Sequence, residues 1–349
     1  MPDDRRPLVD PERLAEWMDG EGLAAGAPIT VERITTGHSN EVFRVRRGDL
    51  DLALRRPPRT PLSPTAHDMA REHRLLRAFT EHGASVPVPS PVALCTDDDV
   101  IGAPFYLMEL LDGVVVRERV PEELAGDPSV PAALAHALVD LLSSLHTFDW
   151  EAAALSGFGR PDGYLERQVP RWLGQLERYK TRDLPEVDEA GRWLADHTPP
   201  MQSPTVIHGD YKLDNVMFAR GLPVCPLAVL DWEQATVGDP LVDVGWLLGL
   251  WLEPGERAPL ASANFALDGA TGLPARAELA GRYAAATGRD LEHLSFYCVL
   301  GLFKLACVME GSYARFCAGT SDDAFFSVLE EGVPSLARRA LEFAEATVA

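Results

Sequence analysis

Basic residues are in short supply in this sequence of 349 residues. Lysine and arginine together number 32 against 53 aspartates and glutamates, which gives a formal net charge of −21 at pH 7. Proteins that bind nucleic acids need a basic surface to neutralise phosphates, so we do not expect nucleic acid as a partner. An acidic surface keeps a protein soluble, and it can also attract a cationic small molecule.

Cysteines are also few, and no two of them form a C-x-x-C pair. An odd number of scattered cysteines predicts neither a disulfide framework nor a zinc site. Reduced, partly buried thiols are typical of the cytoplasm, which is the location we expect. The five cysteines are Cys95, Cys225, Cys298, Cys307 and Cys317.

Long apolar segments are scarce as well. The charged residues at the N-terminus are not followed by the apolar core of a signal peptide. We take the stretch from Leu241 to Leu252 as the most apolar one, and it is short and carries Asp243. A bilayer-spanning helix needs about 20 apolar residues, so we expect no membrane association.

The remaining composition is that of a folded protein, with 46% hydrophobic and 24% charged residues. The first 110 residues alternate short apolar runs with Gly- and Pro-containing turns, which predicts antiparallel strands. The turn before the last of these strands is Asp97-Asp98-Asp99. We expect strands at 29–34, 42–45, 52–55, 92–95 and 105–110, and helices at 11–20 and 67–82.

Beyond Gly113 the pattern becomes mostly helical, with one short β-rich island at 206–231. We therefore predict a bilobal α+β fold. Its N-terminal lobe, residues 1–110, has a small antiparallel sheet and one main helix, and its larger C-terminal lobe, residues 111–349, is mostly helical. Helices are expected at 131–146, 164–180, 186–197, 240–252, 276–287, 291–317 and 322–347.

The β-rich island concentrates the polar residues that catalysis would need. His208, Gly209 and Asp210 follow one apolar segment, Asn215 stands five residues after Asp210, and Asp231 ends a second apolar segment. In phosphoryl transfer a carboxylate accepts the proton of the attacking hydroxyl, while an amide oxygen and another carboxylate hold Mg²⁺ against the phosphates. The spacing H-x-D-x-x-x-x-N is that of a kinase catalytic loop. An isolated H-G-D would be as consistent with a solvated hairpin turn.

With these motifs the chain resembles the aminoglycoside phosphotransferase family, which belongs with choline kinases to the protein-kinase-like superfamily. The resemblance implies a kinase-like fold and an enzyme that uses ATP and Mg²⁺ to phosphorylate a hydroxyl of a small molecule. It also implies that Asp210 is the catalytic base, that Asn215 and Asp231 are the magnesium ligands, and that Glu233 assists at the metal. His208 is expected to brace the loop.

The segment 35–40 lies between two predicted strands, where kinases carry a loop over the nucleotide phosphates. Backbone N–H groups in such a loop can cradle an anion. The loop is poor in glycine, however, so an ordinary hairpin stays an alternative. The residues expected to bind nucleotide here are Gly37, His38, Ser39 and Asn40.

The strand 52–55 corresponds to the kinase strand that carries the phosphate-binding lysine, and it has arginine there. Period-two alternation places Ala53, under the adenine, and Arg55, near the phosphates, on one face. Arginine also pairs with phosphate, and does so bidentately. Whether Arg55 or Arg56 is the working cation stays open, as does a surface position for it. Glu72, on the following helix, is the expected partner of this cation.

Residues 105–111 resemble the hinge strand of kinases. Backbone groups near Glu109 and Leu111 would bond the adenine, with Met108 behind it, and a plain buried strand is compatible with the same pattern. In the helical lobe, His146 is expected to be structural, Asp239 to cap a helix that starts at Pro240, and Asp243 to steady the catalytic loop from beneath.

The motifs look closest to the branch that resembles the kinase portion of proteins fused to acyl-CoA dehydrogenases, a branch that includes hydroxyacyl-CoA kinases. Three interpretations remain: a kinase for an antibiotic or metabolite hydroxyl, a hydroxyacyl-CoA kinase, and a nucleotide-binding pseudokinase that serves as an interaction module. A protein kinase is disfavoured because no D-F-G or A-P-E segment is present. The acceptor, the choice between ATP and GTP, the physiological role and the oligomeric state are left open.

Overall fold

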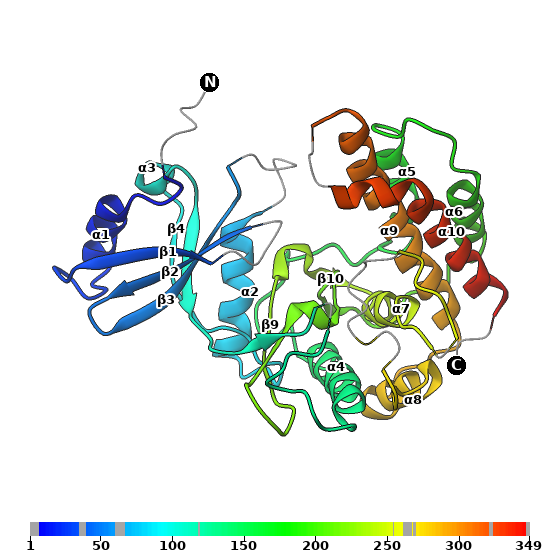
Figure 1. Ribbon diagram of the computed structural model, residues 1–349, viewed down its shortest axis with the longest axis horizontal. Helices are drawn as coiled ribbons and strands as arrows, with labels where there is room; N and C mark the ends of the chain where they lie inside the picture. Colours follow the sequence, from blue (N-terminus) through cyan, green and yellow to red (C-terminus); the bar gives the residue numbers. More distant parts are fainter. Residues whose placement is uncertain are drawn as a thin grey trace. The chain divides into compact units, whose positions relative to one another are not determined.

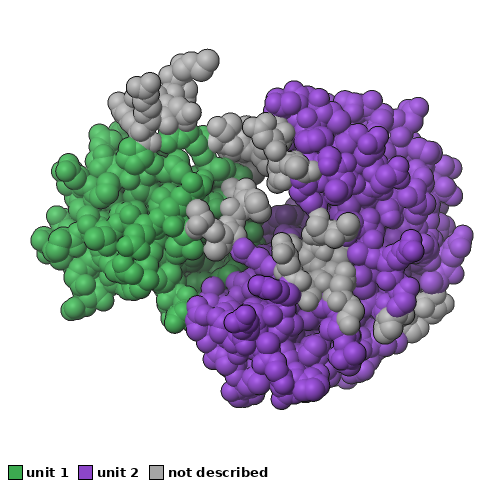
Figure 2. Space-filling model, in the orientation of Figure 1, with its two compact units in different colours: residues 1–112, 152–155, 228–233 green, residues 113–151, 156–227, 234–349 purple. Residues whose placement is uncertain are grey.

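The computed structural model describes residues 7–34, 40–59, 67–117, 119–253, 255–260, 267, 270–320 and 324–346. The chain divides into two compact units, coloured green and purple in Figure 2. Unit 1 consists of residues 1–112, 152–155 and 228–233, and unit 2 of residues 113–151, 156–227 and 234–349. Unit 1 thus includes two short segments, 152–155 and 228–233, that the predicted lobe boundary at residue 110 assigned to the C-terminal lobe.

Unit 1 is built around a five-stranded antiparallel sheet with the strand order β1-β2-β3-β5-β4. In Figure 1, α1 and α2 lie on opposite sides of this sheet. The strands are β1 (Ile29–Ile34), β2 (Glu41–Arg47), β3 (Leu50–Arg56), β4 (Pro91–Cys95) and β5 (Phe105–Glu109), and the helices are α1 (Pro11–Gly20), α2 (Met69–Glu81) and α3 (Asp98–Ile101).

The sequence dictates both faces of this sheet. Leu52 and Leu54 of β3 belong to one apolar cluster with Leu14 and Met18 of α1. The intervening residues of β3, Ala53 and Arg55, are also buried, so alternation assigns them to the opposite face. The prediction that these two residues share a face is confirmed, because Leu54 between them packs on the α1 side.

Unit 2 holds most of the helices together with short strands. The helices are α4 (Val130–His146), α5 (Gln168–Leu176), α6 (Pro185–Asp196), α7 (Leu241–Gly249), α8 (Arg276–Thr287), α9 (Leu294–Cys317) and α10 (Leu329–Glu345). The strands are β6 (Val114–Val115), β7 (Thr205–Ile207), β8 (Val216–Phe218), β9 (Pro226–Val229), whose last two residues belong to unit 1, and β10 (Thr236–Gly238). Short 3₁₀ helices lie at Leu213–Asn215, at Trp232–Gln234, whose first two residues belong to unit 1, and at Ala324–Val328.

The long helix α9 is the centre of unit 2 and packs against α5, α6, α7 and α10. It is long and apolar enough to cross a membrane, with a mean hydropathy of 1.5, but 78% of that apolar window is buried inside the fold. The longest apolar helix is therefore α9 among the described residues, and the expectation based on residues 241–252 did not take it into account. Burial against four helices explains the composition of α9 as that of a core helix. The expected cytoplasmic location stays a prediction.

Several predicted boundaries need correction. The helix expected at 164–180 covers only Gln168–Leu176, and the one expected at 322–347 begins as an α-helix at Leu329 after a turn of 3₁₀ helix. The turn at Asp97 is followed by one turn of helix, α3, and the Asp97 carboxylate accepts the backbone N–H of Asp99. The short strands β6 and β10 were not predicted, because two or three residues carry no periodicity.

Candidate active site

The loop that follows β7 carries the H-G-D motif, and α7 holds it from below. The Asp243 carboxylate accepts the backbone N–H of His208 at 2.6 Å and that of Gly209 at 2.8 Å. Gly209 has a φ of +82°, and a Cβ there would lie 2.8 Å from the carbonyl oxygen of Gln234. The loop therefore needs glycine at this position. The expectation that Asp243 steadies this loop is confirmed.

Asp243 is fully buried, and its charge is retained by hydrogen bonds. Burial alone would raise the pKa of this carboxyl, but the hydrogen bond with His146 and the N–H of His208 hold its pKa below the ordinary value of 3.8. His146 lies 3.3 Å from Asp243 through Nε2, and its Nδ1 lies 2.7 Å from the Tyr283 hydroxyl. Burial lowers the pKa of His146. The structural role expected for this histidine is confirmed.

Two further contacts fix the same loop within unit 2. The Tyr211 hydroxyl donates to the carbonyl of Leu138 in α4 at 2.7 Å. The backbone N–H of Asp210 donates to Nδ1 of His208 at 3.2 Å, so the imidazole braces the turn as predicted. Helices α4 and α7 thus position the residue predicted to be the catalytic base.

Asp210 projects from this braced loop beside Asn215 and Lys212. The amide nitrogen of Asn215 donates to the Asp210 carbonyl at 2.8 Å and reaches its carboxylate at 3.3 Å. Lys212 Nζ lies 3.4 Å from the same carboxylate. Because the Asn215 nitrogen faces Asp210, the Asn215 oxygen is directed away from it. An amide oxygen is a ligand that Mg²⁺ accepts, so this side chain fits the predicted role.

In unit 1, Arg55 forms a buried ion pair with Glu72. Its Nε lies 2.9 Å from Glu72 Oε2, and the same oxygen accepts the Tyr106 hydroxyl at 3.1 Å. The predicted partnership of Arg55 with Glu72 is therefore present. Tyr106 was not singled out in the sequence, although it is the cross-strand neighbour of Arg55 in the β3–β5 register. Knowing that pairing would have revealed it.

Arg55 also bonds Asp231, the residue that ends β9's apolar segment. Its Nη2 lies 2.5 Å from Asp231 Oδ1. Burial disfavours a charged guanidinium, but the facing Glu72 and Asp231 raise the pKa of Arg55, so it keeps its charge. Asp231 has a φ of +64°, a left-handed backbone that costs energy in a non-glycine residue. Such strain tends to be retained at functional sites.

Glu233 is held two residues further on. Its Oε2 accepts the side-chain amide of Asn40 at 2.7 Å and lies 3.2 Å from His67 Nδ1. Burial lowers the pKa of His67, with the charge of Arg55 acting in the same direction. Asn40, predicted to bind nucleotide, is thus tied to Glu233, predicted to assist at a metal. The other residues predicted in that loop, Gly37, His38 and Ser39, lie outside the described residues.

Arg56 has different surroundings from Arg55. Its guanidinium donates to the carbonyls of Leu8 and Ile101, the second at 3.1 Å. It therefore braces the N-terminal segment and α3. Of the two arginines, Arg55 is therefore the one that meets Glu72. Its role as the phosphate-binding cation stays a prediction.

The strand β5 carries the predicted hinge residues. Met108 pairs directly with Ala53 of β3, so both lie on the face that includes Arg55. The Glu109 N–H donates to the Ser90 carbonyl at 2.8 Å, so an adenine bond made by the Glu109 backbone has to use its carbonyl oxygen. Leu111 follows the strand and is half-buried.

The donor set fits magnesium held with the help of phosphates. Among the described residues no three His, Cys, Asp or Glu side chains are grouped so as to hold a metal by themselves. Mg²⁺ is commonly bound by one or two carboxylates together with the phosphates of a nucleotide and water. In unit 1, the carboxylates of Asp231 and Glu233 fit such a role, and in unit 2 the amide oxygen of Asn215 does. That these side chains hold Mg²⁺ stays a prediction.

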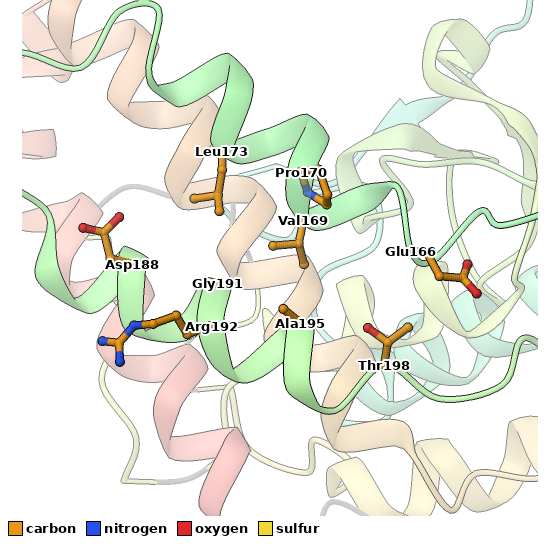
Figure 3. A pocket seen from close by; sticks show the side chains of 9 residues that line it. All are labelled: Glu166, Val169, Pro170, Leu173, Asp188, Gly191, Arg192, Ala195 and Thr198. Atoms are coloured by element: carbon orange, nitrogen blue, oxygen red, sulfur yellow. The ribbon is translucent and has the colours of Figure 1, made fainter.

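A separate groove of about 580 Å³ lies between α5 and α6, as Figure 3 shows. Its floor is apolar, with Val169 and Leu173 on α5 and Gly191 and Ala195 on α6. None of the predicted site residues lines it.

Comparison with known proteins decides the family. Residues 30–282 match the model of the Phosphotransferase enzyme family. The chain belongs to this family. Acyl-CoA dehydrogenase family member 11 of Gallus gallus is 33% identical over 325 residues, which cover 92% of this chain but 41% of that protein. This phosphotransferase chain thus spans less than half the length of its curated relative.

Solved structures support the same assignment. A protein of Ralstonia eutropha with a provisional designation as an aminoglycoside phosphotransferase is 30% identical, with a TM-score of 0.80 over 96% of this chain and 98% of that one. Choline kinase from Cryptosporidium parvum has a TM-score of 0.66 over 96% and 97% of the two chains at 11% identity, which shows the fold alone. The family and the kinase-like α+β fold inferred from sequence are confirmed for this phosphotransferase.

Proposed function

We propose that this phosphotransferase is an ATP-dependent kinase that transfers the γ-phosphate to a hydroxyl of a small molecule. The observation that carries the proposal is the loop at Asp210, whose two preceding N–H groups are both held by the buried Asp243. A carboxylate fixed in this way is suited to orient a hydroxyl and accept its proton, because general-base catalysis depends on position.

The remaining predicted residues receive roles in the same proposal. Arg55 pairs with nucleotide phosphate, for which its planar guanidinium is suited, and Glu72 keeps it in place. Ala53 and Met108 contact the adenine, and the carbonyl of Glu109 and backbone of Leu111 bond its edge. Asn215, Asp231 and Glu233 supply oxygens for Mg²⁺, which when bound neutralises phosphate charge.

A screen for ADP release tests this function. Purified protein would be incubated with Mg·ATP and aminoglycosides, macrolides, amino sugars or choline, and product would be identified by mass spectrometry. Asp210→Asn is the matched control, because it keeps the size of the side chain and removes the base. We expect it to retain ATP binding and to lose about 100-fold or more in kcat. A wild-type rate in this variant would refute the role of Asp210.

A second candidate acceptor is a hydroxyacyl-CoA thioester. It is favoured by the relative named for acyl-CoA dehydrogenase, which contains a segment matching nearly the whole of this chain. The same assay with hydroxyacyl-CoA thioesters, and with the corresponding free hydroxy acids, separates this acceptor from the antibiotic and metabolite classes. ATP binding without turnover on any acceptor or water would instead favour a nucleotide-binding interaction module.

A further inference from the structure

Lys304 is a half-buried lysine of unit 2, on the central helix α9. Its Nζ donates to the carbonyl of Gly209 at 2.5 Å and to Oε1 of Gln234 at 2.9 Å. The same ammonium lies 4.6 Å from the ring centroid of Trp246 and 5.6 Å from that of Trp172. Both hydrogen-bond acceptors are uncharged, so the charge is held by amide oxygens and aromatic faces.

Such a placement is costly and therefore informative. Removing an ammonium from water is unfavourable unless a carboxylate compensates it directly, and a packed apolar side chain would serve stability better. The chain is also sparing with lysine: of its 32 basic residues only Lys180, Lys212 and Lys304 are lysines. Arginine is the usual cation in this chain, yet a lysine occupies this half-buried position.

The contact with Gly209 shows what the lysine does. Gly209 precedes the candidate base Asp210 and has a backbone φ of +82°. Glycine adopts positive and negative φ with similar ease, so its conformation has to be fixed by contacts. Its N–H is held by Asp243 of α7 and its carbonyl by Lys304 of α9. The N–H and the carbonyl of Gly209 are thus fixed by opposite charges from two packed helices, the buried Asp243 carboxylate and the half-buried Lys304 ammonium.

We propose that Lys304 is a positioning residue for phosphoryl transfer, which through the Gly209 carbonyl fixes the direction in which Asp210 projects. This inference rests on the proposed kinase function. It concerns a helix outside the H-G-D loop, and it assigns the indoles of Trp172 and Trp246 the role of keeping the ammonium in place.

The charge of Lys304 should then limit activity on the alkaline side. Burial lowers the pKa of Lys304 to about 8. The positive charges of Arg171 and Lys212 also lower this pKa, whereas the negative charges of Asp210 and Asp243 raise it. These groups come from the catalytic loop, α7 and α5. Above pH 8 the amine loses its charge, its bond to Gly209 weakens, and kcat should fall.

Stability should respond in the opposite sense. Between about pH 8 and the ordinary lysine value of 10.5, the unfolded chain binds more protons at this residue than the folded chain does. The contribution of Lys304 to the free energy of unfolding therefore rises with pH in this window. A fall in kcat together with retained stability would separate positioning from a structural role.

The pH dependence of ADP release from Mg·ATP, with water as phosphoryl acceptor, tests the inference. Wild type should lose kcat above pH 8. Lys304→Arg should keep its kcat to about pH 10, because guanidinium stays charged. Lys304→Met should lose about 10-fold or more in kcat at pH 7 with KM for ATP within about 2-fold, and should lack the alkaline limb. Lys180→Met, at a lysine that is paired with Glu177 and makes no contact with the catalytic loop, is the matched control.

A direct titration keeps the test decisive if a variant fails to fold. Protein labelled with ¹³C-lysine has only three side-chain Cε signals to follow by NMR, and one should titrate near pH 8. The inference is overturned if the lysine signal titrates without a matching fall in kcat, or if Lys304→Met retains the wild-type kcat and alkaline limb while ADP release is normal. Absence of ADP release from wild type with water and with every acceptor of the screen would instead remove the proposed function, and the inference with it.

Discussion

Arg55 and Arg56 are neighbours in the chain, but the guanidinium of Arg55 meets carboxylates and that of Arg56 meets backbone carbonyls. Arg55 pairs with the carboxylates of Glu72 and Asp231, whereas Arg56 donates to backbone carbonyls of Leu8 and Ile101. The difference follows from strand alternation, which directs successive side chains to opposite faces of the sheet. One residue of slip in register would have exchanged the two roles.

We therefore predict a contrast between two alanine variants. Arg55→Ala should raise KM for ATP at least about 10-fold, because a phosphate loses a charge-assisted bond, worth roughly 1.5–3 kcal/mol. Arg56→Ala should leave KM unchanged and lower the free energy of unfolding, since two backbone carbonyls lose their donor. Steady-state kinetics and urea unfolding measure the two effects. Equal changes in KM would contradict the assignment of Arg55.

Asp243 gives a prediction about pH. Asp243→Asn removes one carboxylate oxygen from the N–H groups of His208 and Gly209 and should cost about 3 kcal/mol of stability at pH 7, with a loss in kcat. Since the folded pKa of Asp243 is lowered, the carboxylate stabilises the wild type above pH 4. That contribution disappears as pH falls through the folded pKa. Urea unfolding of wild type and Asp243→Asn should therefore show a smaller difference in the free energy of unfolding at pH 3 than at pH 7.

Among single residues, those that lie close to their partners in the sequence could be predicted, and those whose partners lie far away in the sequence could not. Asp210 and Asn215 were recognisable because they lie five residues apart in one loop. Arg55 and Glu72 were recognisable because a strand and the next helix carry them. Lys304 lies 95 residues from the Gly209 carbonyl that it bonds. A single lysine in an apolar helix forms no motif with its sequence neighbours, so the contact of Lys304 with Gly209 is visible only in the packed structure.

Among the elements, the α7–α9 contact links the catalytic loop to the core of unit 2. Gly245 of α7 faces Tyr297 of α9 so closely that a Cβ would lie 2.2 Å from its carbonyl carbon. Gly301 of α9 in turn faces the backbone of Trp246, where a Cβ would lie 3.1 Å from Cα. Glycines on both helices thus allow the backbones to approach, which brings Asp243 and Lys304 to one loop.

A matched pair of glycine variants tests this contact. Gly245→Ala forces α7 away from α9, so it should destabilise the protein by about 2 kcal/mol or more and lower kcat through Asp243. Gly281→Ala in α8 meets nothing within 4 Å, and should stabilise the protein by about 0.5–1 kcal/mol through helix propensity. Thermal and urea unfolding measure both. Destabilisation by Gly281→Ala, or tolerance of Gly245→Ala, would contradict the role of the contact.

Elements with strong periodicity were predicted well, and short ones were not. Ile29–Ile34 and Arg276–Thr287 have the bounds expected from their patterns and flanking turns. The strand β10 was missed because three residues, Thr236–Gly238, form a strand only by pairing with β7. Similarly, β6 exists through its pairing with β8. Such elements are set by contacts between distant segments, which periodicity does not encode.

For the whole molecule, the acidic net charge bears on how the proposed nucleotide substrate would be bound. The chain carries a charge of −21, and unit 1 gathers Glu72, Asp231 and Glu233 around the single Arg55. A metal-free nucleotide triphosphate would approach an acidic protein against repulsion. Mg²⁺ reduces that repulsion and offers the carboxylates a cation to bind.

We therefore predict that ATP stabilises the protein only together with Mg²⁺. At a ligand concentration of 100 times Kd, Mg·ATP should add about 2.7 kcal/mol to the free energy of unfolding, seen as a rise in Tm. With EDTA the rise should vanish. Asp231→Asn, which keeps the side-chain size, should weaken the Mg·ATP effect, because a neutral amide replaces an anionic ligand. An equal rise in Tm with and without Mg²⁺ in wild type would contradict binding of the nucleotide through these carboxylates and the metal.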